Sequence, residues 1–176
     1  PHSDEAVQAF ANFAAYMAQH YKGKVKYIEV WNEYNAQTFN KQMLGTDVYV
    51  KILKATYNAV KAVDPTIRIV GIDCSGFDFD CIRGVLENGG GDYMDIVSIH
   101  PYPFDKTKYD ETETIQKFQT LKGIMEEFGI EDKPIFFTEA GMSSCTGGYT
   151  EREQANALIM FNAVMRAYDM CDAFMM

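Results

Sequence analysis

The stretch IEVWNEYN, residues 28–35, decides how this chain is interpreted. An apolar run stops abruptly at an aromatic residue, an amide and a carboxylate, which are Trp31, Asn32 and Glu33. A short apolar run bounded by polar residues is typical of a buried β-strand that opens into a loop. The chemistry of Glu33 therefore depends on what stands at the ends of the other strands.

Helices and strands are predicted to alternate strictly along the chain. Capping residues mark several helix starts, among them Ser3 and the capping-box sequences that begin at Asp110 and Thr150. Helices are expected at 3–23, 46–63, 78–87, 110–128 and 150–168. Strands are expected at 25–31, 67–72, 94–99 and 134–138, and a fifth begins at 172.

This alternation indicates a parallel sheet covered by helices, either an open doubly wound sheet or a (β/α)₈ barrel. A doubly wound nucleotide-binding sheet favours a glycine-rich turn between a strand and a helix, whereas Gly89–Gly91 follows a helix. Polar or aromatic residues stand at successive strand ends, including Glu33, Asp73, His100 and Glu139. That pattern favours the barrel, whose functional residues gather where the strands end.

A complete barrel has eight strands and about 250 residues, and this chain of 176 residues supplies about five strands. We therefore expect an α/β fold consisting of a partial (β/α)₈ barrel, with the first three strands absent and residues 1–176 forming one truncated domain. Pro1-His2 lacks an initiator methionine, which indicates a mature form or a fragment. The cellular location is left open, with secretion as one option.

The charge balance excludes two classes of partner. The net charge is −9 and the pI is 4.8, so neither nucleic acid nor an anionic membrane is expected as a partner. No apolar run approaches the roughly 18 residues of a membrane span. Four cysteines without a CxxC pair favour free thiols, with a Cys74–Cys81 bridge as the alternative.

Glu33 and Glu139 each follow a strand, so both are expected to face one shared mouth of the barrel. Two carboxyl groups beside one pocket can divide acid and base duties, and glycoside hydrolysis requires such a pair. A lone glutamate is more often a solvated loop residue. The flanking residues favour chemistry here, because Asn32 can hydrogen-bond a sugar hydroxyl beside the scissile bond.

Three further side chains are candidate substrate contacts. Trp31 either packs in the core or lines the pocket. His100 and Tyr102 stand together at one strand end, and Tyr102 can donate to Glu139 and keep it ionised. We expect no cofactor and no metal, because His2, His20 and His100 supply no cluster of histidines.

Three segments resemble the motifs of clan A retaining glycoside hydrolases. VWNEYN resembles the Asn-Glu motif at the end of strand four, SIHPYP the His-x-Tyr segment at strand six, and FFTEAG the nucleophile motif at strand seven. The nearest groups are the β-xylosidase and α-L-iduronidase type families and the cellulase-like families. The strand count agrees, because numbering the strand before Glu33 as four makes the strand before Glu139 number seven.

The resemblance implies Glu33 as acid/base, Glu139 as nucleophile and Asn32 as a contact to the sugar 2-hydroxyl. His100 and Tyr102 would line the pocket, and the substrate would be a β-linked oligo- or polysaccharide. Tyr34 stands where many relatives have proline. An arginine that usually supports the nucleophile and a tryptophan beyond strand eight are absent, since Trp31 is the only tryptophan.

Two alternatives follow from the missing strands. We expect the chain to be part of a retaining glycosidase that cleaves by double displacement, and the alternative is an inactive carbohydrate-binding or structural partial barrel. Strands at the two sheet edges would leave backbone groups unpaired, so we also expect self-association through the open edges.

Overall fold

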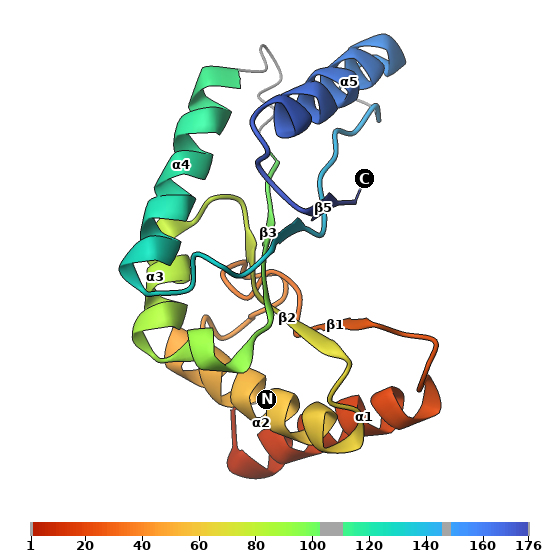
Figure 1. Cartoon of the computed structure of the whole chain (residues 1–176), viewed down its shortest axis with the longest axis vertical. Coiled ribbons are helices and arrows are strands. Elements are labelled where there is room, and N and C mark those ends of the chain that lie inside the picture. Colours follow the sequence, from red (N-terminus) through yellow and green to blue (C-terminus); the bar gives the residue numbers. More distant parts are fainter. Residues whose placement is uncertain (1, 103–110, 146–148, 176) are drawn as a thin grey trace.

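The computed structural model describes residues 2–102, 111–145 and 149–175, which form a parallel sheet and its covering helices (Figure 1). The helices are α1 (Asp4–His20), α2 (Thr46–Val63), α3 (Phe79–Glu87), α4 (Glu111–Glu127) and α5 (Glu151–Ala167), with a 3₁₀ helix η1 (Gly90–Tyr93). The strands are β1 (Tyr27–Glu29), β2 (Arg68–Ser75), β3 (Ile96–His100), β4 (Ile135–Phe137) and β5 (Ala173–Phe174).

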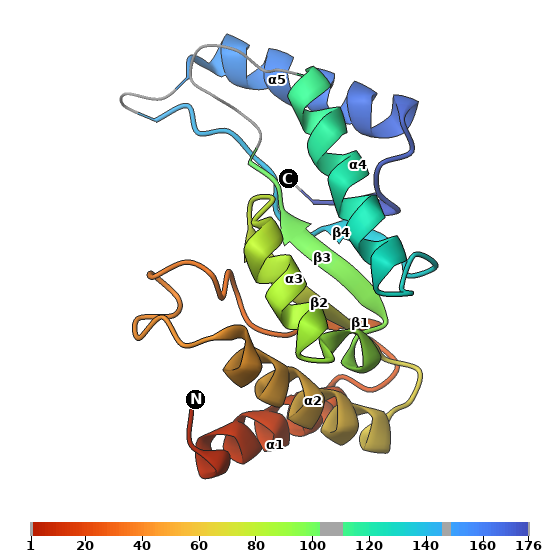
Figure 2. The ribbon, with the colours of Figure 1, turned by 90° about the vertical axis from the view of Figure 1, so that its left-hand side faces the viewer.

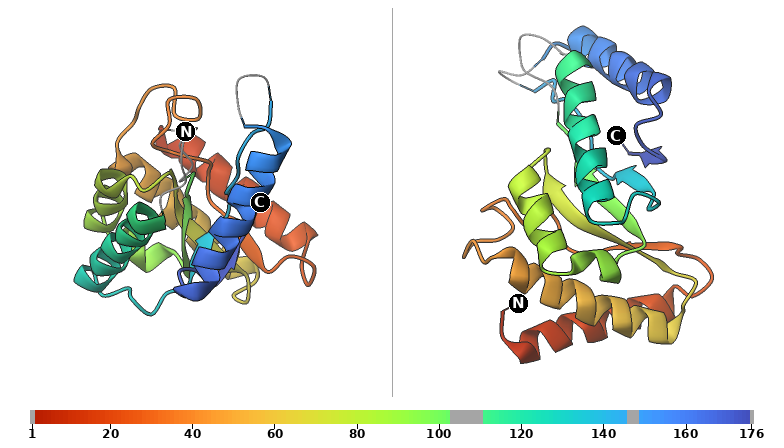
Figure 3. Two further views of the ribbon diagram at one scale, coloured as in Figure 1. Left: turned by 90° about the horizontal axis from the view of Figure 1, so that it is seen from above. Right: turned by 60° about the vertical axis from the view of Figure 1, so that its left-hand side comes forward.

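The strand order is the order of the sequence, β1-β2-β3-β4-β5, and all four pairings are parallel. Crossover connections between parallel strands are right-handed, so sequential strands place their helices on one face. Figure 2 shows α3 and α4 in front of β2, β3 and β4. In Figure 3 the helices follow an arc from α1 and α2 at one end to α5 at the other.

The sheet is curved, because side chains of strands that are not neighbours meet on its helix-free face. Tyr27 of β1 packs edge-on against Phe136 of β4 with ring centroids 5.4 Å apart. Thr138 Oγ1 donates to Glu29 Oε1 at 2.7 Å, although β2 and β3 lie between their strands. A flat sheet would hold these pairs far apart, since neighbouring strands are about 4.8 Å apart. The expected partial (β/α)₈ barrel is confirmed as a half-barrel.

The main core lies between the sheet and the helices. Strand side chains alternate between the two faces, so Ile69 and Phe137 point toward the helices while Val70 and Phe136 belong to a small cluster on the concave face. Fully buried Phe137 contacts the rings of Phe77, Phe118 and Phe161, which come from the loop before α3, from α4 and from α5.

Local sequence signals set most of the helix boundaries. Ser3 accepts from the backbone N–H of Ala6, and Thr150 and Glu153 form the expected capping box of α5. Asp64, at the residue before Pro65, closes α2 in a turn that Thr66 completes through two hydrogen bonds to the Asp64 carboxylate. The expected box at Asp110 lies outside the described residues.

The strands deviate more from expectation than the helices. Strand β1 is three residues long instead of the expected 25–31, because it pairs on one side only and Trp31 at φ 85° ends the extended backbone. Strand β2 continues past Ile72 to Ser75 through a β-bulge, where the pairing with β3 shifts between Ile72 and Cys74.

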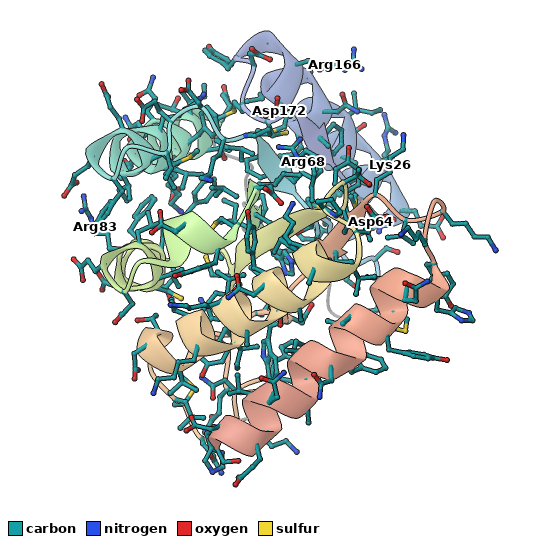
Figure 4. All side chains as sticks on the ribbon, turned by 60° about the horizontal axis from the view of Figure 1, so that its bottom comes forward. Lys26, Asp64, Arg68, Arg83, Arg166 and Asp172 are labelled. Carbon is teal, nitrogen blue, oxygen red and sulfur yellow. The ribbon has the colours of Figure 1, made fainter. Side chains whose placement is uncertain are left out.

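The amino edge of the sheet carries structural carboxylates. Asp95, before β3, accepts from the backbone N–H of Ile69 in β2 and pairs with Lys61 at 2.8 Å. Asp172, before β5, accepts from the backbone N–H of Ile135 in β4. Figure 4 shows Arg68 and Asp172 on this side of the molecule. These contacts satisfy backbone donors and leave the opposite edge to the candidate site.

Two further observations complete the fold. The four cysteines are free thiols, with Cys74 and Cys81 buried. Among the described residues, each helix is too short or too polar to cross a membrane.

Candidate active site

The carboxyl ends of β1 and β2 carry strained backbone. Trp31 and Glu33 have φ angles of 85° and 47°, and Ile72 and Asp73 have φ angles of 82° and 50°. A positive φ is uncommon for residues other than glycine and is a genuine outlier for a β-branched residue such as Ile72. Such strain gathers at functional sites, where surrounding contacts hold it in place.

Tyr49 of α2 supplies that support. Its side chain is fully buried, and its hydroxyl donates to the Val30 carbonyl at 3.2 Å while accepting from the Ile72 N–H at 3.1 Å. One hydroxyl therefore joins the turning points of both strands. Burial, with the charge of Asp73 adding to it, raises the pKa of Tyr49, so the hydroxyl keeps its proton and remains a donor.

Asn35 fixes the loop that follows Glu33. Its side-chain amide donates to the Ser75 carbonyl and to Asp78 Oδ2, and its side-chain oxygen accepts from the Ser75 N–H at 2.8 Å. The loop after β1 is thus bound to the end of β2 and to the first residue before α3. This arrangement holds Glu33 beside the neighbouring strand ends.

His100, at the end of β3, lies at the centre of the site. Its Nδ1 is 3.2 Å from Glu33 Oε1 and 3.6 Å from Glu139 Oε2. Its Nε2 is 3.0 Å from Asp73 Oδ1, a close ion-pair contact that is poorly aligned as a hydrogen bond. Because His100 and Asp73 are both buried, this pair is shielded from water while Glu33 and Glu139 face the mouth.

The charges of these groups are coupled. Burial raises the pKa of Asp73 to about 7, although His100 opposes the shift. Burial by itself lowers the pKa of His100, but Asp73 first, and then Glu33 and Glu139, outweigh it and raise the pKa to about 9. At neutral pH the imidazole therefore holds its proton among the surrounding carboxyl groups.

Glu33 and Glu139 converge on one point. One carboxylate oxygen of each, together with a ring nitrogen of His100, lie within 4.8 Å of one another. The Glu33 side chain is 14% exposed and that of Glu139 is 45% exposed. Tyr102 donates to Glu139 Oε2 at 2.8 Å, and burial together with this hydrogen bond raises the pKa of Tyr102 to about 12. This is the hydrogen bond expected from the positions of Tyr102 and Glu139 at neighbouring strand ends.

Trp31 and Asn32 are the other two candidates from the sequence. Trp31 packs against Phe10 and Tyr34, with ring centroids 5.6 and 5.9 Å apart, and also borders a cavity of about 300 Å³ beneath the loop 38–44. That cavity does not include Glu33 or Glu139 in its lining. Asn32 is partly buried next to Glu33.

The same side chains could hold a cation. In the described part of the chain, Glu29, Asp73 and His100 form one group with suitable spacing, and Glu33, His100 and Glu139 form another. Neither group is visible as a cluster of histidines in the sequence, because each combines one histidine with carboxylates from other strands. Both groups share His100, so a bound cation would replace its proton.

Three residues of this network were not among the sequence candidates: Glu29, Tyr49 and Asp73 as a partner of His100. Glu29 and Asp73 are acids within or directly after apolar β-branched runs, which is a signal for an inward-facing polar group. Tyr49 gave no signal, because a tyrosine on the apolar face of a helix looks like any core residue.

The protein should lose stability as the pH rises from about 6.5 to about 9. The folded state holds the His100 proton up to a pKa of about 9, whereas an unfolded histidine releases it near 6.5. The contribution is complete below pH 6.5 and disappears above pH 9, and is roughly 3 kcal/mol at most. Asp73, whose pKa is also raised, acts in the same direction at lower pH.

Urea unfolding at pH 6, 7.5 and 9 measures this loss. In a His100→Gln variant the free energy of unfolding should change less with pH. A His20→Gln variant, altered at an exposed position on α1, should show the same change of unfolding free energy with pH as the unaltered chain. A free energy of unfolding that stays constant or increases across this range would contradict the charge assignment.

Comparison with known proteins agrees with this geometry. The sequence matches glycosyl hydrolases family 39 over residues 7–176. It is 28% identical over 163 residues to a β-xylosidase of Geobacillus stearothermophilus, covering 83% of this chain and 32% of that protein. The chain thus spans about a third of that relative's length.

Solved structures share the fold. A family 39 glycoside hydrolase of Bacteroides cellulosilyticus has 27% identity and a TM-score of 0.76, covering 99% of this chain and 38% of that one. A monomeric β-xylosidase of Caulobacter crescentus has 18% identity and a TM-score of 0.75, covering 98% and 39%. Since the family match extends over nearly the whole sequence, the chain belongs to family 39 of the glycosyl hydrolases.

Proposed function

We propose that this chain carries the catalytic carboxylates of a retaining glycosidase that cleaves a β-linked saccharide by double displacement. The observation that carries the proposal is the convergence of Glu33 and Glu139, whose carboxylate oxygens approach within 4.8 Å around His100. Retaining enzymes hold their two carboxyl groups about 5–5.5 Å apart, while inverting enzymes leave roughly 6.5–9.5 Å for a water molecule. The approach supports the retaining arrangement.

The surroundings support a division of roles. Glu139 is the more exposed carboxylate, and its Oε2 accepts a hydrogen bond from the Tyr102 hydroxyl, which holds the carboxylate at the open mouth where it can attack the anomeric carbon. Glu33 is recessed against His100 and adjoins Asn32, where it can first protonate the leaving oxygen and then deprotonate water. Asn32, His100, Tyr102 and Trp31 would form the wall of the sugar pocket.

The substrate class follows from the relatives and from charge. Two of the similar proteins are β-xylosidases, so aryl β-xylosides are the first probes within a panel of β-linked aryl glycosides. A net charge of −9 suits a neutral saccharide. The reaction needs no metal, so turnover should persist with excess chelator.

In the full-length protein, Glu139→Gln should abolish turnover of all substrates, because an amide cannot form the glycosyl intermediate. Glu33→Gln should slow substrates with poor leaving groups by about 10²–10⁴-fold and affect activated aryl glycosides much less, because these need little protonation. Initial rates on the two substrate types, with NMR of the first-formed anomer, measure both effects.

Glu131→Gln, at an exposed position between α4 and β4, is the matched control and should leave the rates unchanged. Equal losses on both substrate types for Glu33→Gln would reject its role as the acid. Saccharide binding without any turnover by the full-length protein would favour the alternative of a carbohydrate-binding partial barrel.

We also propose that the isolated 176-residue chain self-associates through the edge at β1. In the described part of the chain strand β1 pairs with β2 alone, and the adjoining surface of α1 carries an apolar cavity of about 290 Å³ lined by Phe10, Phe13 and Ile28, among others. Phe13 is 59% exposed and Tyr16 is 63% exposed. Unpaired backbone beside an apolar surface is the usual template for pairing with a second copy.

Analytical ultracentrifugation of the 20.0 kDa chain at micromolar concentration should therefore show a dimer or larger species. Phe13→Glu should shift it toward monomer, because the charge enters the apolar surface. Ile159→Glu, at a 67% exposed position on α5, should have no such effect. A stable monomer of the unaltered chain would contradict this proposal.

A further inference from the structure

Asp73 is a buried carboxylate whose position the chemistry described so far does not explain. It is fully buried on the bulge of β2, in a left-handed backbone conformation at φ 50°. An unpaired charge in such a place costs several kcal/mol. Neither carboxylate oxygen has a well-aligned hydrogen bond among the described residues, although the backbone N–H of Glu33 is close enough to lower the pKa of Asp73. The close cationic neighbour of the carboxylate is His100, whose Nε2 lies 3.0 Å from Oδ1.

The groups around this pair come from every neighbouring element. Glu29 from β1 lies in the same cluster as Asp73 and His100, and the Tyr49 hydroxyl of α2 is engaged with Val30 and Ile72. On the other side of the ring, Nδ1 faces Glu33 and Glu139. The imidazole is therefore the one cation that the described residues place among these carboxyl groups.

We propose that Asp73 is a positioning residue that anchors His100 through Nε2, so that the Nδ1 proton stays between Glu33 and Glu139 throughout the reaction. The inference rests on the proposed function and extends it. Tyr102 cannot hold both carboxylates in this way, because within the described residues its hydroxyl donates to Glu139 and not to Glu33. The Nδ1 atom of His100 lies 3.2 Å from Glu33 Oε1 and 3.6 Å from Glu139 Oε2, so its proton can stabilise negative charge on either carboxylate.

This position matches the movement of charge in double displacement. Before attack, Glu139 is ionised and Glu33 carries the acid proton. The attack forms a bond between Glu139 and the anomeric carbon while the bond from that carbon to the leaving oxygen breaks, and the leaving oxygen takes the proton of Glu33. The negative charge has then passed from Glu139 to Glu33, and the Nδ1 proton faces the ionised group without movement of the ring. In the second step water attacks the anomeric carbon and gives a proton to Glu33 while the bond to Glu139 breaks, so the charges reverse and the imidazole gains and loses no proton.

Ring-¹⁵N NMR of the 176-residue chain tests the anchor without requiring turnover. His100 should keep its proton up to a midpoint of about pH 9, whereas Asp73→Asn should lower that midpoint by at least about one unit, since burial then acts without the anion. The exposed His2 and His20 serve as internal references. Asp95→Asn, at the amino edge of the sheet, is the matched control and should leave the His100 midpoint unchanged.

A folded Asp73→Asn chain with an unchanged His100 midpoint would overturn the proposal. If that variant does not fold, the unaltered chain still decides the matter. Above its midpoint, His100 should be the Nε2–H tautomer, because Asp73 retains the proton on that nitrogen. An Nδ1–H tautomer would overturn the proposal. The glycosidase assignment can fail in the Glu33 and Glu139 variants without changing either NMR result.

Discussion

The hydroxyl of Tyr49 is the contact on which the site depends. It joins the Val30 carbonyl at the end of β1 to the Ile72 N–H at the bulge of β2, from a fully buried position on α2. Both strands turn into left-handed backbone immediately beyond these atoms. A buried hydroxyl with both of its bonds made is worth little net energy by itself, but its loss would leave two backbone groups unsatisfied where strain is already stored.

From these two strand ends the rest of the site follows. Trp31, packed against Phe10 and Tyr34, directs the chain into the loop that carries Glu33, and Asn35 ties that loop to Ser75. The bulge brings Asp73 behind His100. The curvature of the sheet then brings Glu139 from β4 to the opposite side of the same imidazole. Carboxylates at the amino edge of the sheet accept hydrogen bonds from backbone N–H groups. Carboxylates at the carboxyl edge surround the His100 imidazole and border the open mouth of the site.

Much of this arrangement could be predicted from local signals. Thr46 to Val63 was expected as a helix and forms α2 with the same bounds, because its apolar periodicity and the Asp64-Pro65 stop are encoded locally. The order of polar strand ends predicted that Glu33, His100, Tyr102 and Glu139 would meet, since the carboxyl ends of parallel strands lie at one edge. The structure brings these four side chains together. The proposed roles of all six site residues, Trp31 and Asn32 included, stay predictions.

The elements that sequence reasoning missed depend on tertiary contacts. The bulge in β2 leaves no mark on the apolar pattern, so the sequence predicts a strand that stops at Ile72 and places Asp73 at its end. The roles of Tyr49 and Glu29 arise only when α2 packs on the sheet and when β1 and β4 meet across the concave face. Residues 103–110, which follow Tyr102, lie outside the described structure.

The central claim is that Glu139 forms the covalent bond to the sugar while Glu33 serves as acid and base. Incubating the full-length protein with an activated 2-deoxy-2-fluoro β-glycoside would trap such an intermediate. The fluorine slows both its formation and its hydrolysis, and the good leaving group speeds its formation alone, so the intermediate accumulates. Peptide mass spectrometry should then find one fluorosugar on Glu139. A label on Glu33, or rapid turnover with inversion and no label on either residue, would contradict the account.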